Sequence, residues 1–431
     1  MPHDKITLRV ESDITSLSAE AWNACANPDS RNGSVFPLKP FKLLDDSTHE
    51  AVESTSQTTC AADEEQAFNP FVSFEFLSAL EKSGSANADT GWLPQHLVLE
   101  GADGIFLGVC PAYLKSHSQG EYVFDHGWAE AYERAGGRYY PKLQVAVPFT
   151  PATGRRLLVG TGPQAPAARK ALAQGLTTLA DMRGTSSVHA TFLTDTDAAA
   201  FESEGFLPRT DQQFHWTNRG YGDFDAFLGD LASRKRKAIK RERRDALANG
   251  LTIHPLTGSE ITEDAWDAFF AFYMETGSRK WGRPYLTREF YAMIAESMSN
   301  DVALIMAKRD GKWIAGAINF IGSDTLFGRH WGAIEHHPFL HFEVCYYQAI
   351  DFAIRRGLKT VEAGAQGEHK IARGYLPQTT YSAHYIADRG LRQAVGEYLQ
   401  REREYVAEAV RELTEAGPFR KSGDSEPGDE P

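Results

Sequence analysis

Apolar and polar positions along the chain form a pattern that occurs twice, in two successive stretches. Both stretches contain runs with the helical period of about 3.6 residues and shorter runs with the alternating period of a strand. In the first stretch we expect helices over 74–82 and 164–182 and strands over 96–100, 105–114, 143–149 and 187–193. In the second we expect helices over 264–276, 288–297 and 340–355 and strands over 302–309, 313–321, 325–331 and 360–363. The shared order of elements predicts a duplicated α+β architecture.

The expected fold class is therefore α+β, with two tandem domains that each have a mixed central sheet flanked by helices. The first domain spans residues 1–217 and the second spans 218–412. Residues 28–66 are rich in Ser, Thr, Asp and Pro and lack periodicity, so we expect a disordered insertion in the first domain. The polar residues 413–431 are expected to form a disordered tail.

Composition restricts the class of protein. Hydrophobic residues make up 42% of the chain, and no run reaches the roughly 18 apolar residues that a membrane-spanning helix needs. No CxxC pair occurs among the cysteines, which argues against a disulfide framework and a structural zinc site; they are Cys25, Cys60, Cys110 and Cys345. The first residues do not resemble a secretion leader. A cytoplasmic location is the resulting expectation.

A strongly basic segment stands out in a chain whose net charge is −13. Between Arg234 and Arg244, eight residues are basic and one is acidic. Apolar residues recur through this segment near helical spacing, so we expect one helix over 228–249 with a positive outer face. That face is either a solvated surface or a site for the phosphates of a cofactor, a nucleotide or a tRNA. The acidic net charge disfavours general binding to nucleic acid.

Several phrases of the sequence resemble one family. They are NPFVSFEFLSALEKSG at 69–84, GWLPQHLVLE at 91–100, the segment at 113–159 with FDHGWAEAYERAGGRYYPKL, PFLHFEVCYYQAIDFAI at 338–354 and GAQGEHKIARGYLP at 364–377. On these phrases the chain resembles the FemAB-like predicted N-acyltransferases of the GNAT superfamily, which are labelled peptidoglycan biosynthesis or recognition. The resemblance extends from Asn69 to about Glu404, and residues 28–66 depart from it.

The resemblance implies two tandem GNAT-like domains and an N-acyltransferase. The implied reaction transfers an acyl or aminoacyl group to an amine acceptor, for which the family suggests a peptidoglycan precursor of the cell envelope. Acyl-CoA is one donor to consider, although the segment from Arg329 to Ile334 lacks the last small residue of the usual coenzyme-A loop. Aminoacyl-tRNA is a second donor that the net charge does not favour. The alternative function is a non-catalytic module that recognises a muropeptide or an acyl ligand.

Acyl transfer needs a base near the acceptor, and two places in the second domain offer one. Glu343 is the single carboxylate of the apolar phrase HFEVCYY, where burial would raise its pKa toward that of a general base. A structural pair of Glu343 with His341 or with an arginine is the competing interpretation. The other place is the end of the strand at 360–363, because open sheets bind ligands at the carboxyl ends of their strands.

In the polar cluster that follows this strand, Glu368 or His369 would move the proton. Residues expected to bind the donor or the substrate come from the strands at 325–331 and 360–363, from this cluster and from an aromatic loop of the first domain. They are Arg329, Trp331, Glu362, Gln366, Lys370, Arg373, Tyr139 and Lys142.

Metal binding is not expected. Glu335, His336 and His337 are adjacent, but the sequence has no HExxH or His-x-His pattern, and Pro338 separates these residues from the next helix. Cys345 lies in an apolar phrase, so we expect an inert core residue rather than a nucleophile.

Overall fold

The computed structural model of the chain describes residues 6–28, 67–281, 284–365 and 367–420. Residues 29–66 of the expected insertion and residues 421–431 of the expected tail lie outside the described residues.

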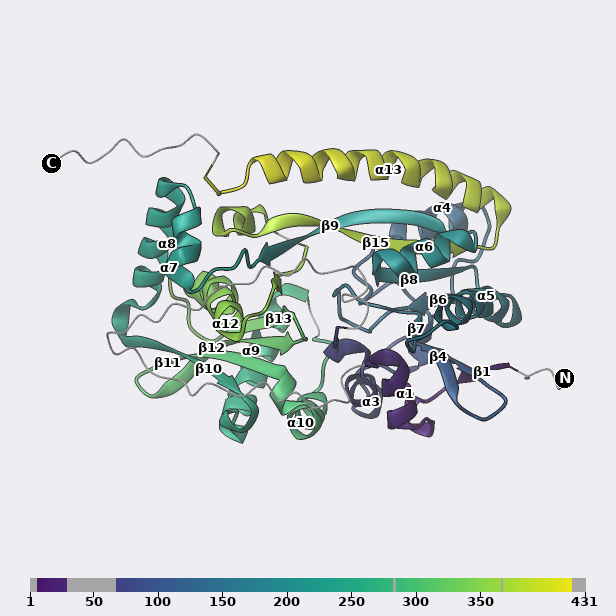
Figure 1. Cartoon of the computed structure of the whole chain (residues 1–431), viewed down its shortest axis with the longest axis horizontal. Helices are drawn as coiled ribbons and strands as arrows, with labels where there is room; N and C mark the ends of the chain where they lie inside the picture. Colours follow the sequence, from purple (N-terminus) through teal and green to yellow (C-terminus); the bar gives the residue numbers. More distant parts are fainter. Residues whose placement is uncertain (1–5, 29–66, 282–283, 366, 421–431) are drawn as a thin grey trace.

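Two sheets form the framework of the described residues (Figure 1). The smaller sheet has the order β1-β3-β4-β7, with β1 (Thr7–Glu11), β3 (His96–Glu100), β4 (Phe106–Cys110) and β7 (Leu158–Val159). The larger sheet has the order β10-β11-β12-β13-β14-β9-β15-β8-β6-β5-β2. Its strands are β2 (Trp92–Pro94), β5 (Ala112–Lys115), β6 (Lys142–Val145), β8 (Ser187–Leu193), β9 (Leu207–Thr217), β10 (Leu251–Thr257), β11 (Val302–Arg309), β12 (Lys312–Ile321), β13 (Thr325–Ala333), β14 (Thr360–Glu362) and β15 (Leu376–Ile386).

The larger sheet repeats one topology in its two halves. In the first half β5 and β6 are antiparallel and β6 and β8 are parallel; in the second half β12 and β13 are antiparallel and β13 and β14 are parallel. The halves then exchange their last strands, because β9 pairs with β14 whereas β15 pairs with β8. The strands β9 and β15 also pair with each other. The expected α+β class with two tandem halves is confirmed, and the halves share one continuous sheet.

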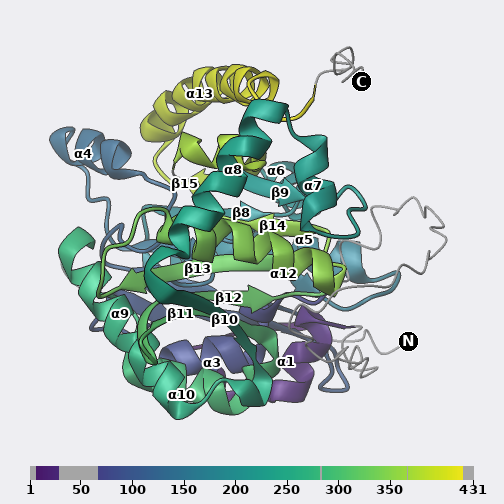
Figure 2. The same cartoon turned by 90° about the vertical axis from the view of Figure 1, so that its left-hand side faces the viewer.

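Helices cover the sheets on both faces (Figures 1 and 2). The longest, α13 (Arg389–Glu415), lies along β9 and β15. The others are α1 (Ala19–Ala26), α3 (Phe74–Lys82), α4 (His126–Arg134), α5 (Ala165–Arg183), α6 (Asp195–Ser203), α7 (Phe224–Asp230), α8 (Ser233–Ala246), α9 (Glu263–Trp281), α10 (Arg288–Ser297), α11 (Leu340–Phe342) and α12 (Gln348–Arg356). A π-helical turn, η6 (Glu343–Tyr347), joins α11 to α12, and a short 3-10 helix, η7 (Glu368–Arg373), follows β14.

Local sequence signals explain several boundaries. Helix α3 begins after Ser73, whose hydroxyl accepts a hydrogen bond from the backbone N–H of Phe76, and Thr287 caps α10 in the same way. Strands β11 and β12 join through Asp310 and Gly311, whose φ angles of 51° and 75° suit a two-residue hairpin turn. The helices expected over 74–82 and 288–297 are confirmed at these bounds.

Two expected elements are divided in the structure. The strand expected over 105–114 becomes β4 and β5 in different sheets, because Pro111 has no backbone N–H to continue a ladder. The single helix expected over 228–249 is wrong: α7 ends at Asp230 and α8 begins at Ser233. Between them Leu231 is extended and forms a bridge with Phe419, which draws the chain out of the helix.

The disorder expected from residue 413 is wrong for the described residues of this segment, because α13 continues to Glu415 and Phe419 pairs with Leu231. Aromatic residues also join the two halves in one core. Phe71 of the first half packs against Phe320 and Phe327 of the second, with ring centroids 5.2 and 5.1 Å apart. The two halves therefore share one packed hydrophobic core around these rings.

Candidate active site between the two halves

Strands β13 and β14 separate near the middle of the larger sheet. They pair only where residues 325–327 face residues 360–362, and β13 then continues to Ala333. A bulge in the β12–β13 ladder places Gly328 opposite Asn319 and His330 opposite Ile318, which leaves Arg329 without a partner on β12. Bulges redirect side chains and are frequent beside active sites. The separation of two parallel strands beside a bulge therefore marks a candidate ligand site.

Glu362 is the last residue of β14 and lies at this separation. Its side chain is buried, and its Oε1 atom lies 3.9 Å from Nε2 of His215, which stands directly opposite on β9. Burial raises the pKa of Glu362 to about 8, although a backbone hydrogen bond from Thr153 and the charge of Arg329 favour the ionised carboxylate. Glu362 can therefore exchange a proton near neutral pH.

His215 is uncharged at neutral pH. Burial lowers the pKa of its imidazole to about 4, and the nearby charge of Lys370 acts in the same direction. A neutral imidazole has one nitrogen that donates and one that accepts. Nε2 of His215 lies 3.5 Å from Oε1 of Gln213, so His215 is a neutral polar neighbour of Glu362.

A loop of the first half contacts Arg329 and Gln213, which lie on the strands beside Glu362. Arg329 donates a hydrogen bond from Nη2 to the backbone carbonyl of Phe149, and Gln213 on β9 donates to the carbonyl of Pro151 at 2.8 Å. The Phe149 ring stacks on Tyr285 of the second half, with centroids 4.6 Å apart. Both halves thus contribute to the surroundings of Glu362.

Helix η7 follows β14 and carries four expected site residues, which are Glu368, His369, Lys370 and Arg373. Lys370 is buried, and its ammonium donates to the backbone carbonyls of Ala363 and Gly364, directly after Glu362. Burial lowers the pKa of Lys370 to about 8. His369 is exposed, and its Nε2 lies 3.1 Å from the hydroxyl of Tyr346. Burial and the neighbouring cations lower the pKa of His369 as well.

Arg373, at the end of η7, makes a different set of contacts. Its guanidinium donates to Glu242 on α8 at 2.8 Å and to the backbone carbonyl of His369 at 2.7 Å. It also lies over the ring of Phe342, 3.6 Å from the centroid. Glu368, at the start of η7, is exposed. Arg373 therefore joins η7 to the basic helix α8.

Glu343 lies at the first position of η6 and is fully buried. Arg243 on α8 contacts both of its carboxylate oxygens, with Nη2–Oε1 and Nε–Oε2 distances of 3.0 and 3.1 Å. Gln348 donates a further hydrogen bond at 2.7 Å. Pairing with an arginine was the competing interpretation for Glu343, and this geometry matches it.

Trp331 lies outside both of these groups. Trp331 packs its ring against His341, with centroids 5.3 Å apart, and Gln366 lies outside the described residues. Within the described parts of the chain, no group of three or more His, Cys, Asp or Glu side chains has the geometry of a metal site.

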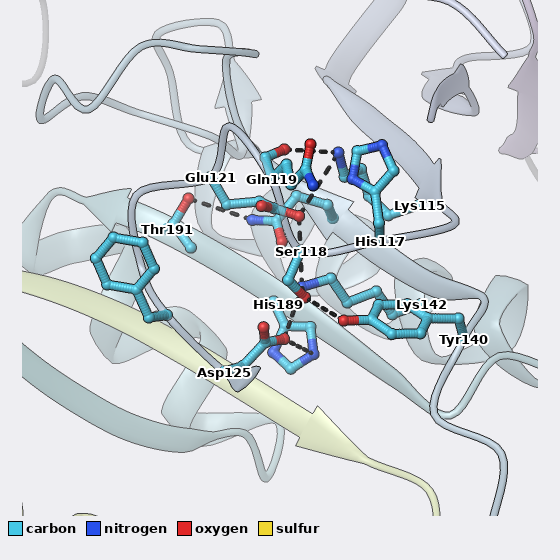
Figure 3. Close-up of polar contacts among 12 residues, drawn as sticks. Lys115, His117, Ser118, Gln119, Glu121, Asp125, Tyr140, Lys142, His189 and Thr191 are labelled. Carbon is cyan, nitrogen blue, oxygen red and sulfur yellow. Dashed lines mark hydrogen bonds and ion pairs between the residues drawn. The ribbon is translucent and has the colours of Figure 1, made fainter. Parts of the chain in front are cut away.

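Tyr139 and Lys142, the predicted residues of the first half, belong to a separate buried cluster. Figure 3 shows Lys142 with several of its polar neighbours. Lys142 donates to Asp125 at 2.6 Å and to Ser118 at 2.7 Å, and its ammonium lies 3.4 Å from Glu121. The hydroxyl of Tyr139 donates to Asp125 at 2.7 Å. Lys142 and His189 hold the pKa of Asp125 below its usual range in spite of burial.

This cluster also connects the halves through two histidines. Nδ1 of His189 on β8 lies 2.7 Å from Nδ1 of His384 on β15. Burial lowers the pKa of His189 to about 3 and lowers that of His384 well below its usual value, so one ring donates and the other accepts. The cluster therefore fastens the exchanged strand β15 to the first half.

The structure thus divides the predicted residues into three groups. The first group is Arg329, Glu362 and Lys370, which lie around the end of β14. The second group is His369, Arg373 and Glu343 on η7 and η6, and these elements are joined to α8 through Arg373 and Glu343. The third group is Tyr139 and Lys142 in the first-half cluster. Sequence reasoning missed His215, because the strand that carries it was not predicted. It also missed Arg243, whose partner is 100 residues away along the chain.

The fold and the site define a duplicated α+β protein with a candidate proton-transfer site where β13 and β14 separate. The chain belongs to the FemAB-like family, described as peptidoglycan biosynthesis/recognition, because the family model matches residues 48–421. No curated protein sequence matches the chain.

Solved structures resemble the chain at low sequence identity. FemX is 13% identical, with 75% of this chain and 93% of that chain covered and a TM-score of 0.47. L-PGS from Bacillus licheniformis is 12% identical, with 78% and 97% covered and a TM-score of 0.46. A tandem GNAT protein from the clavulanic acid biosynthesis pathway is 13% identical, with 89% and 99% covered and a TM-score of 0.42. Among the helices of the described residues, none is both long and apolar enough to cross a membrane.

Proposed function

We propose that the protein is a cytoplasmic N-acyltransferase that moves an acyl or aminoacyl group to an amine of a cell-envelope precursor. Membership of the FemAB-like family supports the class of acceptor. The observation that carries the proposal is Glu362, a buried carboxyl with a pKa of about 8 at the separation of β13 and β14. Such a group is matched to proton transfer at neutral pH.

The proposed reaction has a simple balance of bonds and protons. The nitrogen of the neutral amine attacks the acyl carbonyl carbon, and a C–N bond forms. The carboxylate of Glu362 takes the proton that the nitrogen loses. The bond from the carbonyl carbon to the sulfur or oxygen of the donor then breaks, and the leaving atom receives the proton that Glu362 has taken from the nitrogen. The half-buried guanidinium of Arg329 would stabilise negative charge on the carbonyl oxygen.

Glu362 suits the role of base better than the residues predicted for it. Glu343 already binds Arg243 and Gln348, so its lone pairs are engaged away from the strand separation. His369 and Glu368 are exposed on η7, outside the buried environment that favours proton transfer to a substrate. The catalytic roles of Glu343, Glu368 and His369 stay predictions that substitution to Gln can test.

The donor is proposed as either acyl-CoA or aminoacyl-tRNA, with no metal in the reaction. The purified protein should be incubated with each donor and with a peptidoglycan-precursor peptide that has a free amine, and the acceptor mass should be followed. We expect a mass gain equal to one acyl or aminoacyl group with one of the donors. Glu362→Gln should lower the rate about 100-fold or more.

Glu335→Gln is the matched control, because it makes the same chemical change on a half-buried loop carboxylate that pairs with Arg309. It should leave the rate within about twofold. If the acceptor binds but neither donor changes its mass, the protein is a recognition module and the proposal fails.

A further inference from the structure

A cavity of about 350 Å³ lies where α8, η6 and η7 meet. Its polar lining consists of Arg234, Lys235 and Glu242 from α8, Tyr347 from η6 and Arg373 from η7. The volume is at the lower end of the range of about 300–1,000 Å³ found for small-molecule sites. The cavity is therefore large enough for part of a ligand rather than only for water.

The charges around the cavity are unbalanced. Glu242 is the single acid, and it accepts hydrogen bonds from the hydroxyl of Tyr347 and from Arg373. One cation is thereby neutralised. For Arg234 and Lys235, the described residues supply no anionic partner. A cavity with two unpaired cations and a third cation in its wall attracts an anion with more than one negative charge.

The walls of the cavity are fixed before any ligand arrives. Ile239 anchors α8 in the core, and the buried ion pair between Arg243 and Glu343 holds α8 against η6. The π-helical turn η6, which carries Tyr347, is a type of irregularity that is frequent at functional sites. Binding would therefore cost little reorganisation of the backbone.

The cavity is linked to the candidate active site by η7. Lys370 of this short helix bonds the backbone directly after Glu362, and Arg373, three residues later, lines the cavity. A ligand that occupies both places would have its anionic group at one end of η7 and its reacting group at the other.

We propose that Arg234, Lys235 and Arg373 bind a phosphate or diphosphate group of the acyl donor in this cavity. The inference rests on the proposed acyl transfer and adds a phosphate site made of side chains from α8. Such a site compensates for the loop at 329–334, which lacks the usual coenzyme-A pattern. Arginine and lysine both bind phosphate through charge-assisted hydrogen bonds.

Isothermal titration calorimetry with inorganic pyrophosphate tests the site without requiring turnover. The pocket variant is Arg234→Glu/Lys235→Glu. The control variant is Lys237→Glu/Arg241→Glu, which makes the same change in net charge at exposed positions of α8 that do not line the cavity. We expect the pocket variant to bind pyrophosphate at least about tenfold more weakly than the wild type, and the control to change affinity by less than about threefold. Equal weakening in both variants, no weakening in either, or no binding by the wild type would overturn the proposal.

The same variants distinguish the two sources of the phosphate. Adenosine 3′,5′-bisphosphate represents the nucleotide end of coenzyme A, and uncharged tRNA represents the other donor. The source that loses affinity in the pocket variant, and not in the control, identifies the donor; loss for neither contradicts the site. If pyrophosphate binding depends on the cavity but no acyl transfer occurs, the proposed reaction fails and the phosphate site stands. If acyl transfer occurs with an unchanged donor KM in the pocket variant, the reaction stands and the site fails.

Discussion

Glu362 and His215 face each other across the junction of the two halves, with Oε1 and Nε2 3.9 Å apart. They are directly opposed in the β14–β9 ladder, although β9 is the last strand of the first half. The pair exists only because the halves exchange strands. The candidate proton-transfer site is therefore a product of the whole chain rather than of the second half alone.

The unusual pKa of Glu362 predicts a pH-dependent stability. Between pH 4.5 and about 8 the folded protein keeps a proton on Glu362 that the unfolded chain has released. Because the folded state binds more protons in this window, the contribution of Glu362 to the free energy of unfolding falls as the pH rises. Glu362→Gln removes this dependence. Relative to the wild type, the variant should gain on the order of 1–3 kcal/mol of stability between pH 5 and 8, measured by urea unfolding.

The control for this experiment is Glu335→Gln. Hydrogen bonds from Arg309 and His337 hold the pKa of Glu335 at about 2, so this carboxylate does not titrate between pH 5 and 8. Its stability difference from the wild type should be flat over this range. A flat difference for Glu362→Gln as well would show that Glu362 is not protonated in the folded protein.

The ion pair between Arg243 and Glu343 is expected to stabilise the fold. Removing only Arg243 leaves a fully buried carboxylate without its main partner, so Arg243→Met should destabilise the protein by about 3–5 kcal/mol. The double variant Arg243→Met/Glu343→Gln should recover at least half of this loss, because no buried charge remains. Urea unfolding measures both values, and equal destabilisation in the two variants would contradict a buried charge pair.

The buried histidines His189 and His384 should make the protein sensitive to mild acid. In the unfolded chain they bind protons near pH 6.5, whereas burial holds the pKa of His189 at about 3 and that of His384 well below its usual value. The unfolded state therefore binds more protons below pH 6.5, and stability falls as the pH drops. The double variant His189→Gln/His384→Gln should show a shallower loss of stability between pH 6.5 and 4. The exposed His336→Gln is the control, and an unchanged slope in the double variant would contradict the prediction.

Gly332 on β13 is required by packing against α9. A Cβ atom at this position would lie 2.1 Å from the backbone oxygen of Phe272. Gly332→Ala should therefore destabilise the protein by about 1–3 kcal/mol, measured by chemical denaturation. Gly229→Ala in α7 is the control: nothing lies within 4 Å of its added Cβ, and the substitution should be neutral or stabilising by up to about 1 kcal/mol. Similar effects of the two substitutions would contradict the close approach of α9.

Gly332 also shows why part of the site could be predicted from sequence and part could not. In the sequence it is the glycine of an imperfect coenzyme-A loop, whereas in the structure the backbone of α9 explains the need for a small residue. Elements with strong local signals were predicted well, such as α3 with its Ser73 cap and the hairpin at Asp310 and Gly311. The sequence of this loop did not indicate that α9 packs against Gly332.

Local sequence patterns did not predict which distant strands pair in the sheet. Strands β9 and β15 contain the partly polar segments QQFHWT and PQTTYS and pair with each other in the larger sheet, where α13 packs on both. Neither strand was predicted, so the position of His215 opposite Glu362 could not be foreseen. Glu362 was predicted inside a strand over 360–363, and the structure makes it the last residue of β14.

The most direct test of the account is the pH dependence of kcat/KM for acyl transfer by the wild type and by Glu362→Gln. With Glu362 as the base, kcat/KM should rise with pH and level off above an inflection near pH 8, because the carboxylate form is the active one. Glu362→Gln should lower kcat/KM about 100-fold or more and remove this inflection. A variant that keeps the wild-type rate and the same inflection would show that another group accepts the proton.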